Sequence, residues 1–289
     1  MERAAETGYN LPLCSAHIHN SHPTPQHCSM RVIILDHPQQ VSQLAADIIC
    51  STVATKPNAV LGLATGSTPL ETYRLLVERY EQGLVSFAQV TTFNLDEYVG
   101  LGPDDSQSYH QFMHSHLFSR ADFCVDRCHI PAGLAPDLKA EGERYERAIE
   151  AAGGIDLQLL GLGSDGHIAF NEPGSSLASR TRVKALSAQT LQDNARFFGS
   201  EEQVPRLALT MGVGSILAAR RAVLLAIGSH KAAAVRDLVE GPLTARVPAS
   251  ALQLHPQAMI LLDQAAASQL ENTEYYHRAE QAQRTRSPA

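Results

Sequence analysis

One short segment carries the side chains best suited to moving protons. Residues 163–172 (GSDGHIAFNE) directly follow the apolar run 155–162, and their glycines and asparagine are typical of a loop. A strand followed by a polar loop is where open α/β sheets build their sites. An imidazole has an unperturbed pKa of about 6.5, which a neighbouring carboxylate raises toward neutrality. Asp165, His167 and Glu172 are therefore a candidate acid/base unit; the alternative is a solvated polar turn whose histidine caps a nearby group.

A second candidate is the pair of adjacent carboxylates in the segment TTFNLDEY. Side chains alternate in direction along an extended backbone, so only one of Asp96 and Glu97 can face a cleft. Burial would raise the pKa of that carboxyl, as a base that removes a proton from carbon requires. A helix start or turn with two acids is the alternative interpretation.

Two junctions, each a strand followed by a glycine and a helix, could hold a phosphate. In LGLATGSTP, Gly66 lets the backbone approach a ligand closely, and Ser67 or Thr68 can cap the following helix, whose first amides favour an anion. No lysine follows this glycine, so the segment is not a P-loop. In LAIGSHK, Lys231 could reach an anion as a point charge. A tight structural turn and a surface lysine are the alternatives.

The elements that position these motifs alternate between strands and helices. Because strands joined through helices must cross over, we expect an α/β fold with a mainly parallel sheet covered on both faces and with sites at the carboxyl ends of the strands. Apolar runs predict strands at 31–35, 59–64, 90–95, 155–162, 222–227 and 258–262, and helical patterns cover 38–54, 69–82, 107–117, 138–151, 208–219 and 231–239.

Composition limits the partners and the compartment. The chain has 289 residues, is 44% hydrophobic and carries a formal net charge of −7. That charge argues against a nucleic acid or a membrane surface as partner, because both need a basic face. No apolar run reaches the length of about 18 residues that spans a membrane, and charges interrupt any signal peptide. The 5 cysteines are an odd number in a chain too large to need disulfides, which indicates reduced thiols and a cytoplasmic location.

Residues 1–29 differ from the rest of the chain. They scatter Cys14, Cys28 and several histidines among proline, serine, threonine and asparagine, in a spacing that matches no standard zinc pattern. We predict a disordered leader or an artificial tail at 1–29, followed by a single domain over 30–289.

The motifs together resemble the glucosamine-6-phosphate deaminase family, also called glucosamine-6-phosphate isomerase. The resemblance implies a Rossmann-like αβα sandwich and a hydrolytic isomerisation in amino-sugar catabolism, which converts glucosamine 6-phosphate and water to fructose 6-phosphate and ammonia. It covers residues 30 to about 276 and is specific, because DGHIAFNEP and FNLDEY occur in the right order. The segments that carry it are 61–69, 93–101, 108–118, 161–186, 210–213 and 252–256.

The resemblance implies a role for each candidate acid and base. Asp96 is expected to move a proton between C2 and C1 of the open-chain sugar. His167 is expected to open the pyranose ring, supported by Asp165 and Glu172. This chemistry requires neither hydride transfer nor a Lewis acid, so we predict no cofactor and no metal.

The same resemblance assigns the substrate phosphate to the turn at Gly66, Ser67 and Thr68, together with Lys231 and Arg196. Arg196 lies within the stretch from about 186 to 206, which in the family behaves as a mobile lid over the active site. A cation delivered by a lid couples closure to substrate binding and expels water.

Regulation and assembly are also implied. Some members are activated by N-acetylglucosamine 6-phosphate between subunits, at positions that match Ser175, Arg182 and Lys184. Arg182 and Lys184 lie two apart, so in extended backbone both face one side and could share a phosphate; two solvated cations on a loop are the alternative. In activated members the amino terminus helps hold the activator, and the matching residue here is Met30, so the leader is expected to weaken activation. Family members include hexamers, and we expect a homo-oligomer.

Two other functions remain open. Phosphogluconolactonases and ribose-phosphate isomerases share the implied fold, so a different sugar-phosphate reaction is the nearest alternative. A sugar-phosphate sensor without catalysis is the other. The presence of all four candidate catalytic residues argues against both. One visible departure is Ser164, which stands where many relatives have asparagine.

Overall fold

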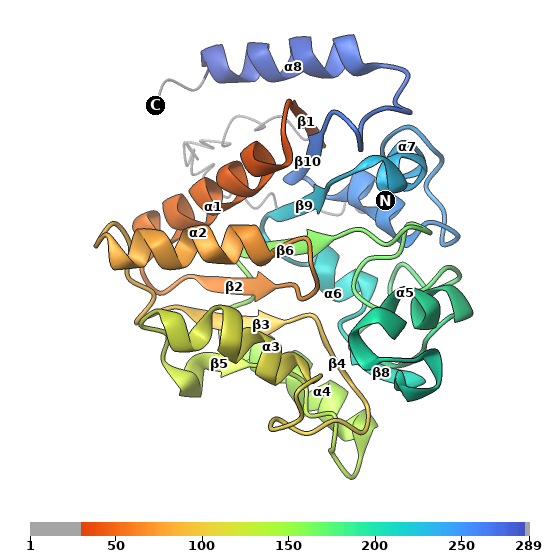
Figure 1. Cartoon of the computed structure of the whole chain (residues 1–289). Helices are drawn as coiled ribbons and strands as arrows, with labels where there is room; N and C mark the ends of the chain where they lie inside the picture. The colour runs from red at the N-terminus through yellow and green to blue at the C-terminus, as the bar shows by residue number, and fades with distance from the viewer. Residues whose placement is uncertain (1–29, 287–289) are drawn as a thin grey trace, which may run out of the picture.

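Seven parallel strands form the central sheet of the computed structural model, which describes residues 30–286 (Figure 1). Their order is β1-β10-β9-β6-β2-β3-β5, and each neighbouring pair is parallel. Parallel strands need crossover connections, so the predicted α/β fold is confirmed. The predicted leader, 1–29, lies outside the described residues. The strands are β1 (Arg31–Leu35), β2 (Val60–Leu63), β3 (Thr91–Asn94), β5 (Cys128–His129), β6 (Leu157–Gly161), β9 (Ala222–Ala226) and β10 (Ala258–Asp263).

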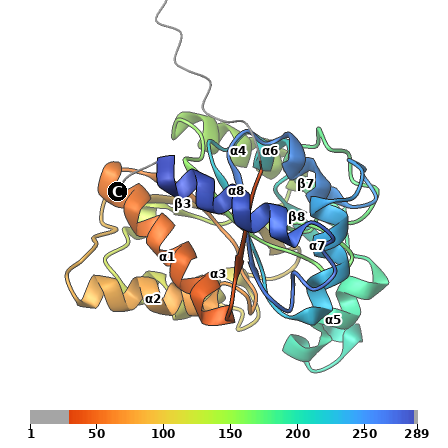
Figure 2. The same cartoon turned by 90° about the horizontal axis from the view of Figure 1, so that it is seen from above.

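The central sheet is buried on both faces, which explains its nearly continuous apolar strands. On β1, Val32 and Ile34 enter one core, while Ile33 enters the other. Helices α1, α2 and α3 cover the face of Ile33, and α4, α6 and α7 cover the opposite face; α8 runs beside the edge strand β1 (Figure 2). These helices are α1 (Pro38–Thr55), α2 (Leu70–Glu81), α3 (Tyr109–His116), α4 (Leu138–Ala151), α6 (Val213–Leu217), α7 (Ala232–Val239) and α8 (Thr273–Arg286).

A second, three-stranded antiparallel sheet adjoins the carboxyl edge of the first. It contains β4 (Asp96–Tyr98), β8 (Leu207–Thr210) and β7 (Arg182–Ala185), in the order β4-β8-β7. The predicted helix over 208–219 is therefore wrong in its first part, because residues 207–210 pair as a strand between two partners that are distant in sequence. Only Val213–Leu217 forms the helix α6.

The chain passes from the first sheet to the second at Leu95. The Leu95 amide donates to the Leu63 carbonyl of β2 at 3.1 Å, and the Leu95 carbonyl accepts from Met211 N, just after β8, at 2.7 Å. The predicted strand at 90–95 thus ends at Asn94, and Asp96 begins a new strand. This transition places Asp96 at the carboxyl end of the central sheet.

Helix α5 (Ala188–Phe198) lies within the segment predicted as a lid. Its residues Leu191 and Phe198 pack against a small third core that includes Tyr98 and Phe170. No helix among the described residues combines the length and the apolar character needed to cross a bilayer.

Candidate active site

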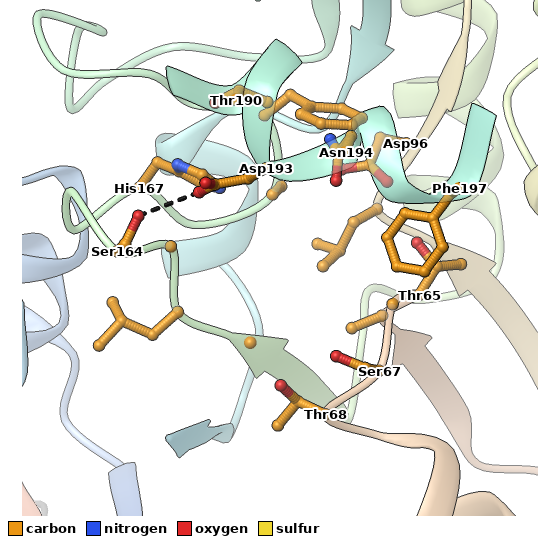
Figure 3. A pocket seen from close by; sticks show the side chains of 18 of the residues that line it. Thr65, Ser67, Thr68, Asp96, Ser164, His167, Thr190, Asp193, Asn194 and Phe197 are labelled. Carbon is orange, nitrogen blue, oxygen red and sulfur yellow. Dashed lines mark hydrogen bonds between the residues drawn. The ribbon is translucent and has the colours of Figure 1, made fainter. Parts of the chain in front are cut away.

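A pocket of about 430 Å³ opens at the carboxyl ends of β2, β3, β6 and β9. The loops after these four strands line it, and helix α5 forms another wall (Figure 3). The structure thus brings the separate sequence motifs to one cavity, as expected for a parallel sheet. Of the predicted site residues, seven line this pocket: Gly66, Ser67, Thr68, Asp96, His167, Arg196 and Lys231.

Two glycines shape the loop that follows β6. Gly166 has a φ of +84°, a left-handed conformation that glycine adopts without strain. Gly163 faces the imidazole so closely that a Cβ there would lie 2.3 Å from ring atoms of His167. The loop closes on itself, because the Gly163 amide donates to the His167 carbonyl at 2.9 Å. Gly163 and Gly166 therefore set the position of the His167 imidazole in this loop.

Asp165 and His167 form a hydrogen-bonded pair, 2.7 Å between Oδ1 and Nδ1. Burial alone would raise the pKa of Asp165, but hydrogen bonds and charge attraction from His167 outweigh it, and the pKa is lowered. Asp165 is thus ionised at neutral pH and accepts from Nδ1, which leaves Nε2 of His167 to exchange a proton with a ligand.

Glu172 completes the group that the sequence predicted, although it does not line the pocket itself. Its Oε1 accepts from the Ser187 amide at 3.0 Å, and its buried Oε2 has no hydrogen-bond partner among the described residues. Ligand atoms of Asp165, His167 and Glu172 lie within 4.8 Å of one another, close enough that the three could also share a divalent cation.

Asp96 and Glu97 point in opposite directions, as the alternation along β4 predicted. Asp96 lines the pocket, and burial, followed by the charge of Glu97, raises its pKa to about 8. Hydrogen bonds from Thr210 and from the Phe170 amide oppose that rise. Glu97 is fully buried on the other side, where it accepts from the backbone amide and Nδ1 of His110 at the start of α3. Asp96 therefore has the properties of a base poised near neutral pH.

Of the predicted phosphate residues, Ser67 and Thr68 lie across the pocket from Asp96 (Figure 3). Gly66, Arg196 and Lys231 also line this pocket. Gly66 has a φ of +94°, and the turn it forms carries Ser67 and Thr68 into the first turn before α2. Lys231 ends a short 3₁₀ helix, Ser229–Lys231, at the pocket wall. Burial lowers the pKa of Lys231, and the nearby charge of Arg196 lowers it further. Two cations and a turn of exposed amides suit an anion here.

Sequence reasoning missed several residues that line the pocket. Five of those named below lie on α5, and their spacing of three or four residues, typical of one helix face, was the available signal. Tyr109 is another, and its hydroxyl hydrogen-bonds to Tyr98 and Thr65. The pocket residues absent from the prediction include Thr65, Tyr109, Gln189, Thr190, Asp193, Asn194, Phe197 and His230.

The residues matched to a regulatory site lie outside the pocket. Arg182 and Lys184 are on β7, so the predicted extended backbone is present and both face one side of the strand. Arg182 donates to Asn171 Oδ1 at 2.7 Å, and burial lowers its pKa. Ser175 is buried, and its hydroxyl oxygen has no partner among the described residues.

Comparisons with known proteins agree with this geometry. A glucosamine-6-phosphate deaminase from Hahella chejuensis is 54% identical over 247 residues, which are 86% of this chain and 94% of the relative. A protein of the same name from Mycolicibacterium smegmatis is 53% identical over 248 residues, 86% of this chain and 95% of the relative.

Solved structures share the fold. A protein described as a monomeric glucosamine-6-phosphate deaminase superposes with a TM-score of 0.82 at 49% identity, over 83% of this chain and 100% of its own. A 6-phosphogluconolactonase from Trypanosoma cruzi has a TM-score of 0.67 at 22% identity, over 85% and 99% of the two chains, and has the same fold. The family model described as glucosamine-6-phosphate isomerases/6-phosphogluconolactonase matches residues 36–261. This chain belongs to that family.

Proposed function

We propose that this chain converts glucosamine 6-phosphate and water to fructose 6-phosphate and ammonia. One observation carries the proposal. His167, held by its hydrogen bond to Asp165, and Asp96, a buried carboxyl with a raised pKa, line one pocket together with two cations that suit a phosphate, Arg196 and Lys231. The names of the relatives support it, since family members about half identical over nearly their whole length are glucosamine-6-phosphate deaminases.

His167 opens the sugar ring in the first step. The ring oxygen takes a proton from Nε2 while the bond between C1 and that oxygen breaks, and the proton lost by the C1 hydroxyl returns to Nε2. Asp165 holds Nδ1 and so fixes the ring orientation. Glu172 supports the loop through its bond to the Ser187 amide. The product of this step is the open-chain aldehyde.

Asp96 then moves a proton from C2 to C1. The aldehyde acidifies the C2 proton, and Asp96 removes it while the aldehyde oxygen takes a proton from water, which gives an enaminol with a C1–C2 double bond. Return of the proton to C1 leaves an imine at C2, which water hydrolyses to the ketone and ammonia. These steps are proton transfers and a hydrolysis, so they require no hydride acceptor. We propose that the enzyme works without a cofactor or metal.

The raised pKa of Asp96 predicts a pH dependence. A base acts only when deprotonated, so kcat/KM is expected to rise with pH and to level off above about pH 8, and to fall about tenfold per pH unit below it. A profile of kcat/KM from about pH 6 to pH 9 measures this. A flat profile across that range would contradict the assignment of Asp96 as the base.

The phosphate clamp predicts an effect on substrate binding. Lys231→Ala and Arg196→Ala are each expected to raise the KM for glucosamine 6-phosphate, because each removes a charge-assisted contact of about 1.5–3 kcal/mol. Lys139→Ala is the matched control, since this lysine is an exposed cation on α4. Unphosphorylated glucosamine should be a very poor substrate. An unchanged KM in both variants would place the phosphate elsewhere.

A direct assay tests the proposed function. Purified protein is mixed with glucosamine 6-phosphate, and ammonia and fructose 6-phosphate are measured over time. We expect both products in equal amounts. A parallel reaction with 6-phosphogluconolactone tests the reaction of the more distant structural relatives. Hydrolysis of the lactone without release of ammonia would refute the proposal.

We further propose a regulatory site at Ser175, Arg182 and Lys184 that binds N-acetylglucosamine 6-phosphate. The bond from Arg182 to Asn171 supports it, because it links the strand to the residue beside Glu172. Substrate saturation with and without that ligand, in the full-length chain and in a form beginning at Met30, tests the site. If N-acetylglucosamine 6-phosphate changes substrate saturation equally in Arg182→Ala and in the parent, the proposed regulatory site is wrong.

The assembly and location of the chain are further proposals. We propose a cytoplasmic homo-oligomer, a hexamer as in some family members, and a single catalytic domain over 30–289. One solved relative is described as monomeric, so the number of subunits has to be measured for this chain. Sedimentation velocity on the full-length chain distinguishes a monomer from a dimer and a hexamer.

A further inference from the structure

Two hydrogen bonds join helix α5 to the loop that carries the acid/base unit. At the start of the helix, the Ser187 amide donates to Glu172 Oε1 at 3.0 Å. Six residues further along, Ser164 Oγ donates to Asp193 Oδ2 at 3.1 Å (Figure 3). Ser164 immediately precedes Asp165, so the second bond reaches the neighbour of a candidate catalytic residue.

The carboxylate of Asp193 is held in place from two sides. Its Oδ1 accepts from Gln189 Nε2, one turn earlier on α5, at 2.8 Å, while Oδ2 accepts from Ser164. Arg196 follows Asp193 by three residues and lines the same pocket, so the two side chains share a face of the helix. A bond that fixes Asp193 therefore fixes the part of α5 that presents Arg196.

The apolar contacts of α5 lie on another side of the helix. Leu191, Ala195 and Phe198 make them, on the side that faces the third core. Gln189, Asp193 and Phe197 lie toward the pocket, and Phe197 is 42% exposed. Among the described residues, the other hydrogen bond between this segment and the catalytic loop is at Ser187, which caps the start of α5 and donates to Glu172.

We propose that Ser164 and Asp193 form a latch that holds α5 against the catalytic loop and so preorganises Arg196 for the substrate phosphate. Both are positioning residues that act through Arg196. The latch rests on the proposed function only in that the pocket binds a sugar phosphate. An already placed cation binds the phosphate without first ordering the helix, and preorganisation of this kind raises affinity.

The latch predicts an effect on binding in Ser164→Ala. The affinity for sugar phosphate should fall by roughly two- to tenfold, the range of one hydrogen bond, and the KM for glucosamine 6-phosphate should rise by the same factor with a smaller change in kcat. Isothermal titration with glucose 6-phosphate, which has no amine to lose, measures the binding without turnover. Gln192→Ala is the control, because this exposed residue lies on α5 away from the pocket.

A double-mutant cycle isolates the bond from the charge of Asp193. That charge lies near Lys231 and itself affects an anionic ligand, so Asp193→Ala alone mixes two effects. The effect of Ser164→Ala should disappear in the Asp193→Ala background, whereas Asp193→Asn should keep it, because the amide oxygen still accepts a hydrogen bond.

Two results would overturn the latch: equal affinities of the parent and Ser164→Ala, or the same loss from Ser164→Ala in both backgrounds. The test is also separate from that of the proposed function. A chain that binds glucose 6-phosphate with the predicted coupling but releases no ammonia would support the latch and refute the deaminase activity.

Discussion

Asp96→Asn is expected to lower kcat by about 10²–10⁴-fold while substrate binding stays close to that of the parent. Asparagine has nearly the same shape but cannot accept the C2 proton at neutral pH. The loss should therefore appear in the proton transfer, and exchange of the C2 hydrogen with deuterated solvent should disappear together with turnover. Steady-state kinetics and NMR of the recovered substrate measure the two quantities.

Asp104→Asn is the matched control, because the same chemical change is made at an exposed loop position outside the pocket. It should leave turnover and exchange unaltered. Near-normal C2 exchange in Asp96→Asn would remove Asp96 from the mechanism, even if the release of ammonia were slow.

The substitution His167→Gln is expected to cause the second large loss of rate, and the size of the loss should depend on whether the substrate is cyclic or open. Glutamine cannot exchange a proton near neutral pH, so the cyclic sugar is expected to react about 10²–10⁴-fold more slowly. A ketose phosphate that is already open should bypass this step. In the ammonia-consuming direction, a linear ketose analogue should still exchange its C1 proton.

The control for the imidazole is His114→Gln, an exposed histidine on α3. It is expected to behave like the parent with both substrate forms. Equal loss of exchange with cyclic and open substrates in His167→Gln would show that the imidazole does more than open the ring.

The sequence was informative wherever local pattern and tertiary environment agree. The strands of the central sheet are buried on both faces, so their apolar runs could be recognised, and parallel topology then placed the motifs at one edge. The alternation of Asp96 and Glu97 needed only the geometry of extended backbone. Gly66, His167 and Lys231 were recognised because each follows a strand in a glycine-containing loop, and all three line the pocket.

The second sheet could not be predicted in the same way. Ala208, Leu209 and Thr210 are all buried, so β8 shows no alternation of apolar and polar residues, and its pattern fits a helix equally well. Its strand conformation comes from pairing with β4 and β7, which are far away in the sequence. The pocket face of α5 was missed for a related reason: the spacing of its polar residues indicates one helix face, but only the packing of Leu191 and Phe198 on the third core shows that this face lines the pocket.

The pairing of β8 has a mechanical consequence. Thr210 stands opposite Asp96 on one side and opposite Arg182 on the other, in the same antiparallel sheet. The candidate base and the candidate effector strand are therefore separated by two strand spacings, about 9–10 Å, and are bridged by backbone hydrogen bonds. Backbone hydrogen bonds hold the three strands together. We therefore expect a movement of β7 to displace Asp96 in the same direction.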